Sequence, residues 1–203
     1  MNLSEYIFSL QQAALSATTP RGSTLSPTSN PYVLSDGLLK NITLQLASAL
    51  HHIHTRDLIH LDVKPDNVLV SFNGILRLAD FGQARIVRPD GGGYDWDMDG
   101  VEGDSIFMAP ELLDPSSSGP PTYAADIFSL GLLLVELASG VSLPKSGDIW
   151  HDLREGRAHQ HIHNRVSKQM EHIILNLLEP KPHKRPTAKV LLEWLETHHE
   201  DTK

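Results

Sequence analysis

Four polar side chains lie near one another in the sequence and are suited to chemistry. Asp62, Lys64 and Asn67 share one short segment, and Asp80 follows it. Carboxylate and amide oxygens are hard ligands that suit Mg²⁺, which binds through one or two carboxylates together with substrate phosphates. A nearby carboxylate can orient a hydroxyl and accept its proton, while a lysine ammonium neutralises charge on a phosphoryl group. These residue types therefore favour phosphoryl transfer.

A predicted hairpin positions these residues. Two short β-favouring runs, residues 67–70 and 75–78, flank an Asn73-Gly74 pair, which is typical of a hairpin turn. Such a hairpin would fold Asp80 back toward the other three side chains. We therefore expect three oxygen-bearing groups to converge on one cation.

Helices are expected around this hairpin. Apolar residues recur at three- and four-residue steps from Leu39 to Ile53, and Ser35 or Asp36 is placed to cap the helix that this pattern predicts. Later helices are expected at residues 149–155, 167–178 and 187–197.

An almost entirely apolar helix is expected from Thr122 to Ser139, ending at Gly140 and buried on every side. Its most apolar part contains Glu136 and is shorter than the roughly 20 residues that span a membrane, so we expect no membrane segment. The fold class is therefore mainly α with a small β-hairpin.

Composition narrows the function classes. The chain has 203 residues, and 25 acidic against 17 basic residues give a net charge of −8, which argues against nucleic acid as a partner. The absence of cysteine excludes disulfides, thiolate zinc sites and thiol catalysis. It also favours an intracellular location.

Three motifs occur in a specific order. His60–Asn67 has the pattern His-x-Asp-x-Lys-Pro-x-Asn, Asp80–Gly82 is Asp-Phe-Gly, and Ala109–Glu111 is Ala-Pro-Glu. This order resembles the catalytic half of a protein kinase. The resemblance implies that residues 1–203 form a partial kinase domain, the larger C-terminal lobe, with residues 80–111 as the activation segment.

The same resemblance assigns roles to the four polar residues. Asp62 would be the catalytic base, and Lys64 would contact the γ-phosphate of ATP. Asn67 and Asp80 would hold Mg²⁺, with ATP and Mg²⁺ as cofactors.

The resemblance also implies supporting roles. Asp126 is similar to the buried aspartate that braces the catalytic loop, and hydrogen bonding to backbone amides would explain an Asp inside an apolar helix. Arg185 is similar to the arginine that pairs with Glu111. We interpret His60 as structural rather than as a proton carrier.

Four segments resemble the Wee/Myt branch, the kinases that inhibit cyclin-dependent kinases: residues 60–65, 102–104, 108–113 and 124–132. The Myt side of the branch is the more similar, and similarity covers most of residues 38–195. The resemblance implies a cyclin-dependent kinase as protein substrate and a location in the nucleus or cytoplasm. Lys64 matches the serine/threonine-type arrangement, but this branch also acts on tyrosine, so the acceptor stays open.

Two positions depart from the family pattern. Leu61 replaces the arginine that binds an activation-loop phosphate in many kinases, so we do not expect phosphate to order this loop. Ile106 stands where the branch is expected to have arginine, which weakens inference about substrate choice. The acidic residues between Asp90 and Asp104 either attract a basic substrate or form a solvated loop.

Several kinase motifs do not occur in this sequence. It contains neither Gly-x-Gly-x-x-Gly nor Val-Ala-x-Lys, which position the nucleotide phosphates in kinases. We therefore expect the N-terminal lobe to be missing and this chain alone to be inactive. The alternative is a non-catalytic lobe that acts as a binding module.

Three other segments carry weaker signals. Residues 16–31 are rich in Ser, Thr and Pro and are expected to form an inserted loop. His159, His161 and His163 alternate in a way that could bind zinc, but a polar loop is the preferred interpretation. His51, His52 and His54 are expected to be packing or solvent-exposed groups.

Overall fold

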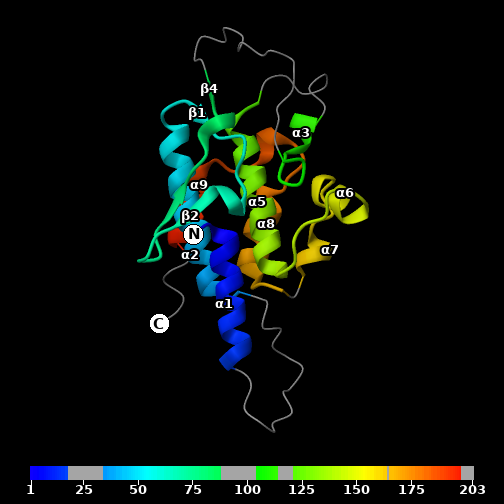
Figure 1. Ribbon diagram of the computed structural model, residues 1–203. Coiled ribbons are helices and arrows are strands. Elements are labelled where there is room, and N and C mark those ends of the chain that lie inside the picture. The colour runs from blue at the N-terminus through cyan, green and yellow to red at the C-terminus, as the bar shows by residue number, and fades with distance from the viewer. Residues whose placement is uncertain (18–33, 88–103, 114–120, 164, 198–203) are drawn as a thin grey trace.

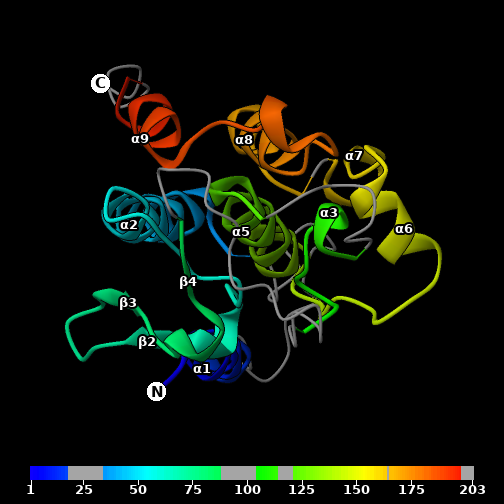
Figure 2. The same cartoon turned by 90° about the horizontal axis from the view of Figure 1, so that it is seen from above.

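A central helix organises the molecule. The computed structural model describes residues 1–17, 34–87, 104–113, 121–163 and 165–197, and these are mainly helical (Figure 1). Helix α5 (Tyr123–Ser139) lies in the middle of the other helices (Figure 2) and is buried almost all round, as its apolar sequence predicts. The Thr122 hydroxyl caps its start and Gly140, with φ 66°, ends it in the left-handed conformation that glycine readily adopts.

The long helices pack around α5 through apolar faces. Helix α2 (Asp36–His54) lies between α5 and α9 (Ala188–Thr197), and α8 (Lys168–Leu177) covers another side of α5. Of the two expected caps for α2, the structure uses Ser35, whose hydroxyl oxygen accepts from Leu38 N at 3.3 Å. These helices confirm the predicted elements to within two residues at their ends.

The predicted hairpin is present. Strand β2 (Val68–Val70) pairs antiparallel with β3 (Leu76–Leu78), with Val68 opposite Leu78. Gly74 takes φ 77° in the turn. The hairpin and α1 (Leu3–Ala17) lie together, away from α8 and α9 (Figure 2).

A second antiparallel pair was not predicted. Strand β1 (Leu58–Ile59) pairs with β4 (Arg85–Ile86) and closes a loop that contains all four predicted site residues. Each strand has only two residues, and the partners lie far apart in sequence, so neither carries a periodic signal. The β content is therefore larger than the single hairpin we expected.

Short elements complete the described chain. They are η1 (Pro65–Asn67), η2 (Phe81–Gln83), α3 (Pro110–Leu113), α6 (Asp148–Arg154), α7 (His159–Ile162) and η3 (Pro182–Lys184). The predicted 16–31 insertion lies outside the described residues except for its first two positions, which complete α1. Within the described part of the chain, we find no helix of the length and hydropathy needed to cross a bilayer.

Candidate active site

The start of the segment His60–Asn67, called the catalytic loop below, is fixed by a buried carboxylate on α5. Asp126 is fully buried, and its two oxygens accept from His60 N at 2.9 Å and Leu61 N at 2.8 Å. His54 Nε2 adds a third contact at 2.9 Å. A buried carboxylate is tolerated when such donors replace its hydration. The backbone-bracing role expected for Asp126 agrees with this geometry.

His54 is a supporting residue whose specific role was missed. Its side chain is 9% exposed and connects the end of α2 to Asp126. The sequence alone predicts a packing or exposed group, since a histidine at a helix end carries no signal for a partner 72 residues away. The contact holds α2, α5 and the catalytic loop together.

Leu61 occupies an unusual backbone conformation. Its φ is 63°, which is uncommon for a residue with a branched side chain and costs about 1–3 kcal/mol. The hydrogen bond from Leu61 N to Asp126 and the burial of its side chain hold it there. An apolar core side chain therefore stands where the kinase resemblance expects a phosphate-binding arginine.

His60 has both ring nitrogens engaged by the backbone. Nε2 lies 3.0 Å from Ala79 O, and Nδ1 lies 3.3 Å from Asp62 N. A carbonyl only accepts and an amide N–H only donates, so the ring fits as the neutral tautomer with its proton on Nε2. This arrangement agrees with a structural role and leaves no ring nitrogen for proton transfer.

Three of the four predicted site residues meet directly. Asp62 Oδ2 lies 2.9 Å from Lys64 Nζ and accepts from Asn67 Nδ2 at 2.6 Å. Asn67 Nδ2 also donates to Asp62 O at 3.0 Å. Both side-chain contacts use Oδ2, so among the described residues Oδ1 of Asp62 has no hydrogen-bond partner. That oxygen is available to a substrate hydroxyl.

Asp80 is tied to this group through the backbone. Ala79 N donates to Asn67 O at 2.8 Å, and Ala79 O contacts His60, so the chain delivers Asp80 beside the catalytic loop. Asp80 takes φ 56°, and its Oδ1 accepts from Gly82 N at 3.2 Å. Within the described chain it makes no hydrogen bond or ion pair with Asp62, Lys64 or Asn67.

The donor set at this site fits a magnesium ion with phosphate ligands. The Asn67 amide nitrogen is committed to Asp62, which leaves its carbonyl oxygen for a cation. The exposed Asp80 carboxylate is the second donor. Two protein oxygens suit Mg²⁺, which keeps waters and phosphate oxygens as its other ligands. Among the described residues no cluster of three or more His, Asp or Glu could hold a metal alone.

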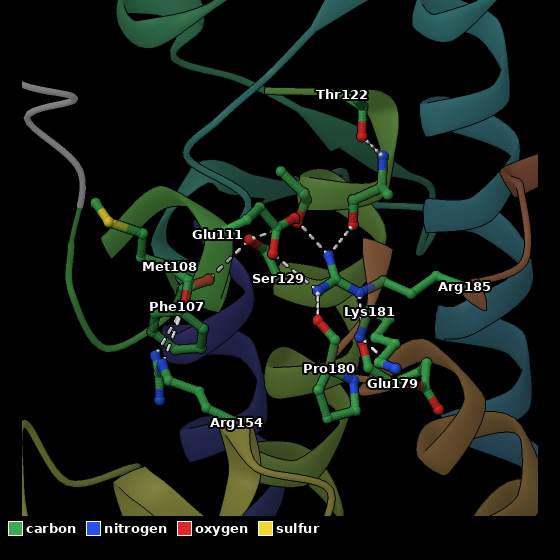
Figure 3. Close-up of polar contacts among 12 residues, drawn as sticks. Phe107, Met108, Glu111, Thr122, Ser129, Arg154, Glu179, Pro180, Lys181 and Arg185 are labelled. Carbon is green, nitrogen blue, oxygen red and sulfur yellow. Dashed lines mark hydrogen bonds and ion pairs between the residues drawn. The ribbon is translucent and has the colours of Figure 1, made fainter. Parts of the chain in front are cut away.

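A buried ion pair fixes the end of the predicted activation segment. Arg185 forms a bidentate pair with Glu111, at 2.6 and 2.8 Å, and its side chain is completely buried (Figure 3). Its remaining N–H groups donate to the carbonyls of Ala124, Glu179 and Pro180. All five guanidinium donors are thus satisfied. The pairing expected between Arg185 and Glu111 is present.

Comparison with known protein families shows that residues 11–195 of this chain match the protein kinase domain. The chain belongs to the protein kinase family. As a kinase, it has the mainly helical architecture and small antiparallel sheets that its catalytic-loop motifs led us to expect.

Several curated relatives of this kinase chain are named as kinases that inhibit cdc2 or mitosis. It is 35% identical to the "membrane-associated tyrosine- and threonine-specific cdc2-inhibitory kinase wee-1.3" of Caenorhabditis briggsae, over 81% of this chain and 24% of the relative. It is 40% identical to a Drosophila melanogaster kinase named as membrane-associated, tyrosine- and threonine-specific and cdc2-inhibitory, over 75% and 27%. It is 43% identical to the "mitosis inhibitor protein kinase mik1" of Schizosaccharomyces pombe, over 55% and 18%. The chain spans about a quarter of the length of the first of these relatives.

Two further predictions concern the activation segment and the histidines at positions 159, 161 and 163. Of the predicted activation segment, residues 88–103 lie outside the described residues, and so does most of the acidic run that ends at Asp104. The histidine trio belongs to a short helix and its end rather than to a loop. His161 contacts Asp152 at 3.0 Å and His163 contacts Glu171 at 3.3 Å.

Proposed function

We propose that this chain is the catalytic lobe of a Wee/Myt-type kinase that transfers the γ-phosphate of ATP to a hydroxyl of a cyclin-dependent kinase. The contact of Asp62 with Lys64 and Asn67 carries the proposal. It joins a carboxylate with a free oxygen, a cation and an amide oxygen within one short loop. Nothing else in the described chain groups these functions.

Each site residue has one task in this mechanism. Asp62 Oδ1 orients the acceptor hydroxyl and takes its proton. Lys64 neutralises charge on the γ-phosphate as it transfers, which weakens its hold on Asp62. Asn67 and Asp80 would hold Mg²⁺, which supplies charge neutralisation at the phosphates when bound.

The substrate proposal rests on the relatives. The nematode and fly proteins are named as cdc2-inhibitory and as specific for tyrosine and threonine, which favours the Myt side of the branch and both acceptors. A serine/threonine-only kinase is therefore not what we propose. A kinase with such a substrate acts inside the cell, in the nucleus or cytoplasm.

We propose further that residues 1–203 by themselves turn over ATP very weakly. Two apolar side chains beside the site, Leu69 and Phe81, are 48% and 43% exposed. Such surface is suited to covering by a nucleotide base and by a second lobe that carries the phosphate-binding motifs. This chain's sequence does not contain those motifs.

The test is phosphate transfer by the full-length gene product to a cyclin-dependent kinase bound to its cyclin. We expect transfer to threonine and tyrosine, and a loss of at least about 100-fold in Asp62→Asn, which keeps the shape of the side chain but cannot accept the proton. Asp148→Asn, an exposed site on α6, is the matched control. Activity of Asp62→Asn within about threefold of wild type would refute the proposal, and wild-type binding without transfer would favour the non-catalytic alternative.

A further inference from the structure

A four-residue segment before the Ala-Pro-Glu motif is held by side chains through every one of its carbonyls. The segment, residues 105–108, is called the clamped segment below. Phe107 O accepts from Ser129 Oγ at 2.7 Å. Ser105, Ile106 and Met108 present their carbonyl oxygens to Arg154, at distances from 2.9 to 3.2 Å.

Arg154 lies at the centre of this arrangement. It is 5% exposed, and its guanidinium stacks 3.9 Å over the ring of Trp150, one turn earlier on α6. Its Nη1 donates to Trp150 O at 3.0 Å, and Trp150 Nε1 donates to Ser105 O at 3.1 Å. The two side chains together bind α6 to the clamped segment; Figure 3 shows Arg154 below Phe107 and Met108.

The partners of Arg154 are unusual for a buried cation. In the described chain they are carbonyl oxygens and an indole ring, with no carboxylate among them, in contrast to Arg185. Burial lowers the pKa of Arg154 to about 10, so it is still charged at neutral pH. A planar fork with five donors can serve several carbonyls at once, which a lysine cannot do.

The clamp is coupled to the catalytic loop through α5. Asp126 holds His60 and Leu61, and Ser129, three residues later on the same helix, holds Phe107. Residues three apart lie on one helix face, about one turn from each other. The clamped segment therefore has a fixed position relative to Asp62.

We propose that Arg154, with Trp150, is a positioning residue that holds the clamped segment as a rigid docking edge for the protein substrate beside Asp62. This inference rests on the proposed function. It requires no phosphate on the activation segment, which agrees with Leu61 in place of a phosphate-binding arginine. Loss of the clamp affects presentation of the protein substrate and spares the nucleotide.

The test compares Arg154→Met and Arg154→Lys with wild type in the full-length gene product. We expect Arg154→Met to raise KM for the cyclin-dependent kinase at least about tenfold while KM for ATP stays within twofold. Arg154→Lys should recover only part of the loss, because one ammonium cannot reach all the carbonyls. Arg165→Met is the matched control, since the side chain of this exposed arginine makes one long hydrogen bond to the described residues, 3.3 Å to Ser139 O.

Hydrogen exchange gives a readout that does not need activity. In Arg154→Met, peptides covering residues 104–110 should exchange at least about tenfold faster, while peptides covering 58–67 keep the wild-type rate. An unchanged KM for the protein substrate would overturn the proposal. A parallel increase in both KM values, together with faster exchange of residues 58–67, would also overturn it. The first outcome excludes a role for Arg154 in positioning the clamped segment. The second would show that Arg154 stabilises the core in general.

The outcomes also separate this inference from the proposed function. If wild type phosphorylates casein but no cyclin-dependent kinase, the proposed substrate is wrong, and the KM comparison is made with casein. If wild type phosphorylates neither protein, the clamp has no substrate to position and both proposals fail.

Discussion

Buried ionic side chains in this protein are stabilised by three different kinds of partner. Asp126 is satisfied by two backbone N–H groups and a histidine, and Arg185 by a carboxylate and three carbonyls. Arg154 is satisfied by carbonyls and by the ring of Trp150. Glu136 is only half-buried, and among the described residues its carboxylate accepts one hydrogen bond, from Leu143 N at 2.9 Å. Its charge therefore has fewer compensating groups than the charges of the three buried residues.

Glu136 makes stability depend on pH. Burial, and to a smaller extent the charges of Asp66 and Asp104, raise the pKa of Glu136 above its usual 4.5, and the Leu143 N–H only partly offsets this. The unfolded chain therefore releases the proton first as pH rises. The stabilisation present below about pH 4.5 is lost as pH rises through the higher folded-state pKa.

We therefore expect Glu136→Gln to gain in thermal stability relative to wild type as pH increases from 4 to 7, because glutamine keeps an oxygen for Leu143 N but carries no charge. Tm measured across this range tests the prediction. Glu193→Gln, an exposed site on α9, controls for the loss of one carboxylate. A difference in Tm between wild type and Glu136→Gln that is constant from pH 4 to 7 would contradict it.

The contacts of a side chain could be predicted where its charge requires a particular kind of partner. Asp126 inside an apolar helix demanded donors, and the pairing of Glu111 with Arg185 came from the kinase resemblance. Arg154 and Ser129 were missed because their partners are backbone carbonyls, which every residue has. Trp150 and Arg154, four residues apart on one helix face, were the available signal.

Packing of α5 against the end of α8 depends on a glycine. A Cβ on Gly131 would lie 2.9 Å from Leu178 Cδ2 and 3.0 Å from Leu177 Cβ, and the second atom has little freedom to move. The steric cost of about 1–3 kcal/mol exceeds the gain of about 1 kcal/mol that alanine brings to a helix interior.

We expect Gly131→Ala to lower the free energy of unfolding by about 1 kcal/mol, or about 2–4 °C in Tm. Gly37→Ala on α2 is the opposite case, since no atom lies within 4 Å of its added Cβ, and it should stabilise by up to about 1 kcal/mol. Thermal or urea unfolding of both variants checks the sign. Equal shifts in the same direction would show that helix propensity, not close packing, decides both sites.

Elements that carry a local sequence pattern were predictable, and elements that depend on distant partners were not. The repeated apolar steps of α2 and the uniform apolar sequence of α5 determine helices locally. By contrast, β1 and β4 exist because each completes the other across a long loop, and α3 begins where Glu111 is held by Arg185. Such elements are set by tertiary contacts, which a local pattern does not contain.

Contacts within the described chain hold one side of the candidate site more completely than the other. Asp62, its neighbours and the clamped segment are all held by contacts within the chain, whereas Leu69 and Phe81 remain half exposed. Positioning of the phosphates supplies most of the catalysis of phosphoryl transfer.

We therefore expect purified residues 1–203 to show no Mg²⁺-dependent ATP turnover above the Asp62→Asn background. Release of inorganic phosphate measures it, and thermal unfolding in parallel ensures that the chain is folded. Turnover that Asp62→Asn abolishes would show that the described lobe positions the nucleotide without further help.

The attachment of both the catalytic loop and Phe107 to α5 has a consequence for how such enzymes diverge. Because Asp126 and Ser129 sit on one stiff helix, changes in the outer helices displace both attachments as a unit and leave their spacing unaltered. Peripheral loops can therefore change in sequence while the catalytic loop and Phe107 keep their relative position.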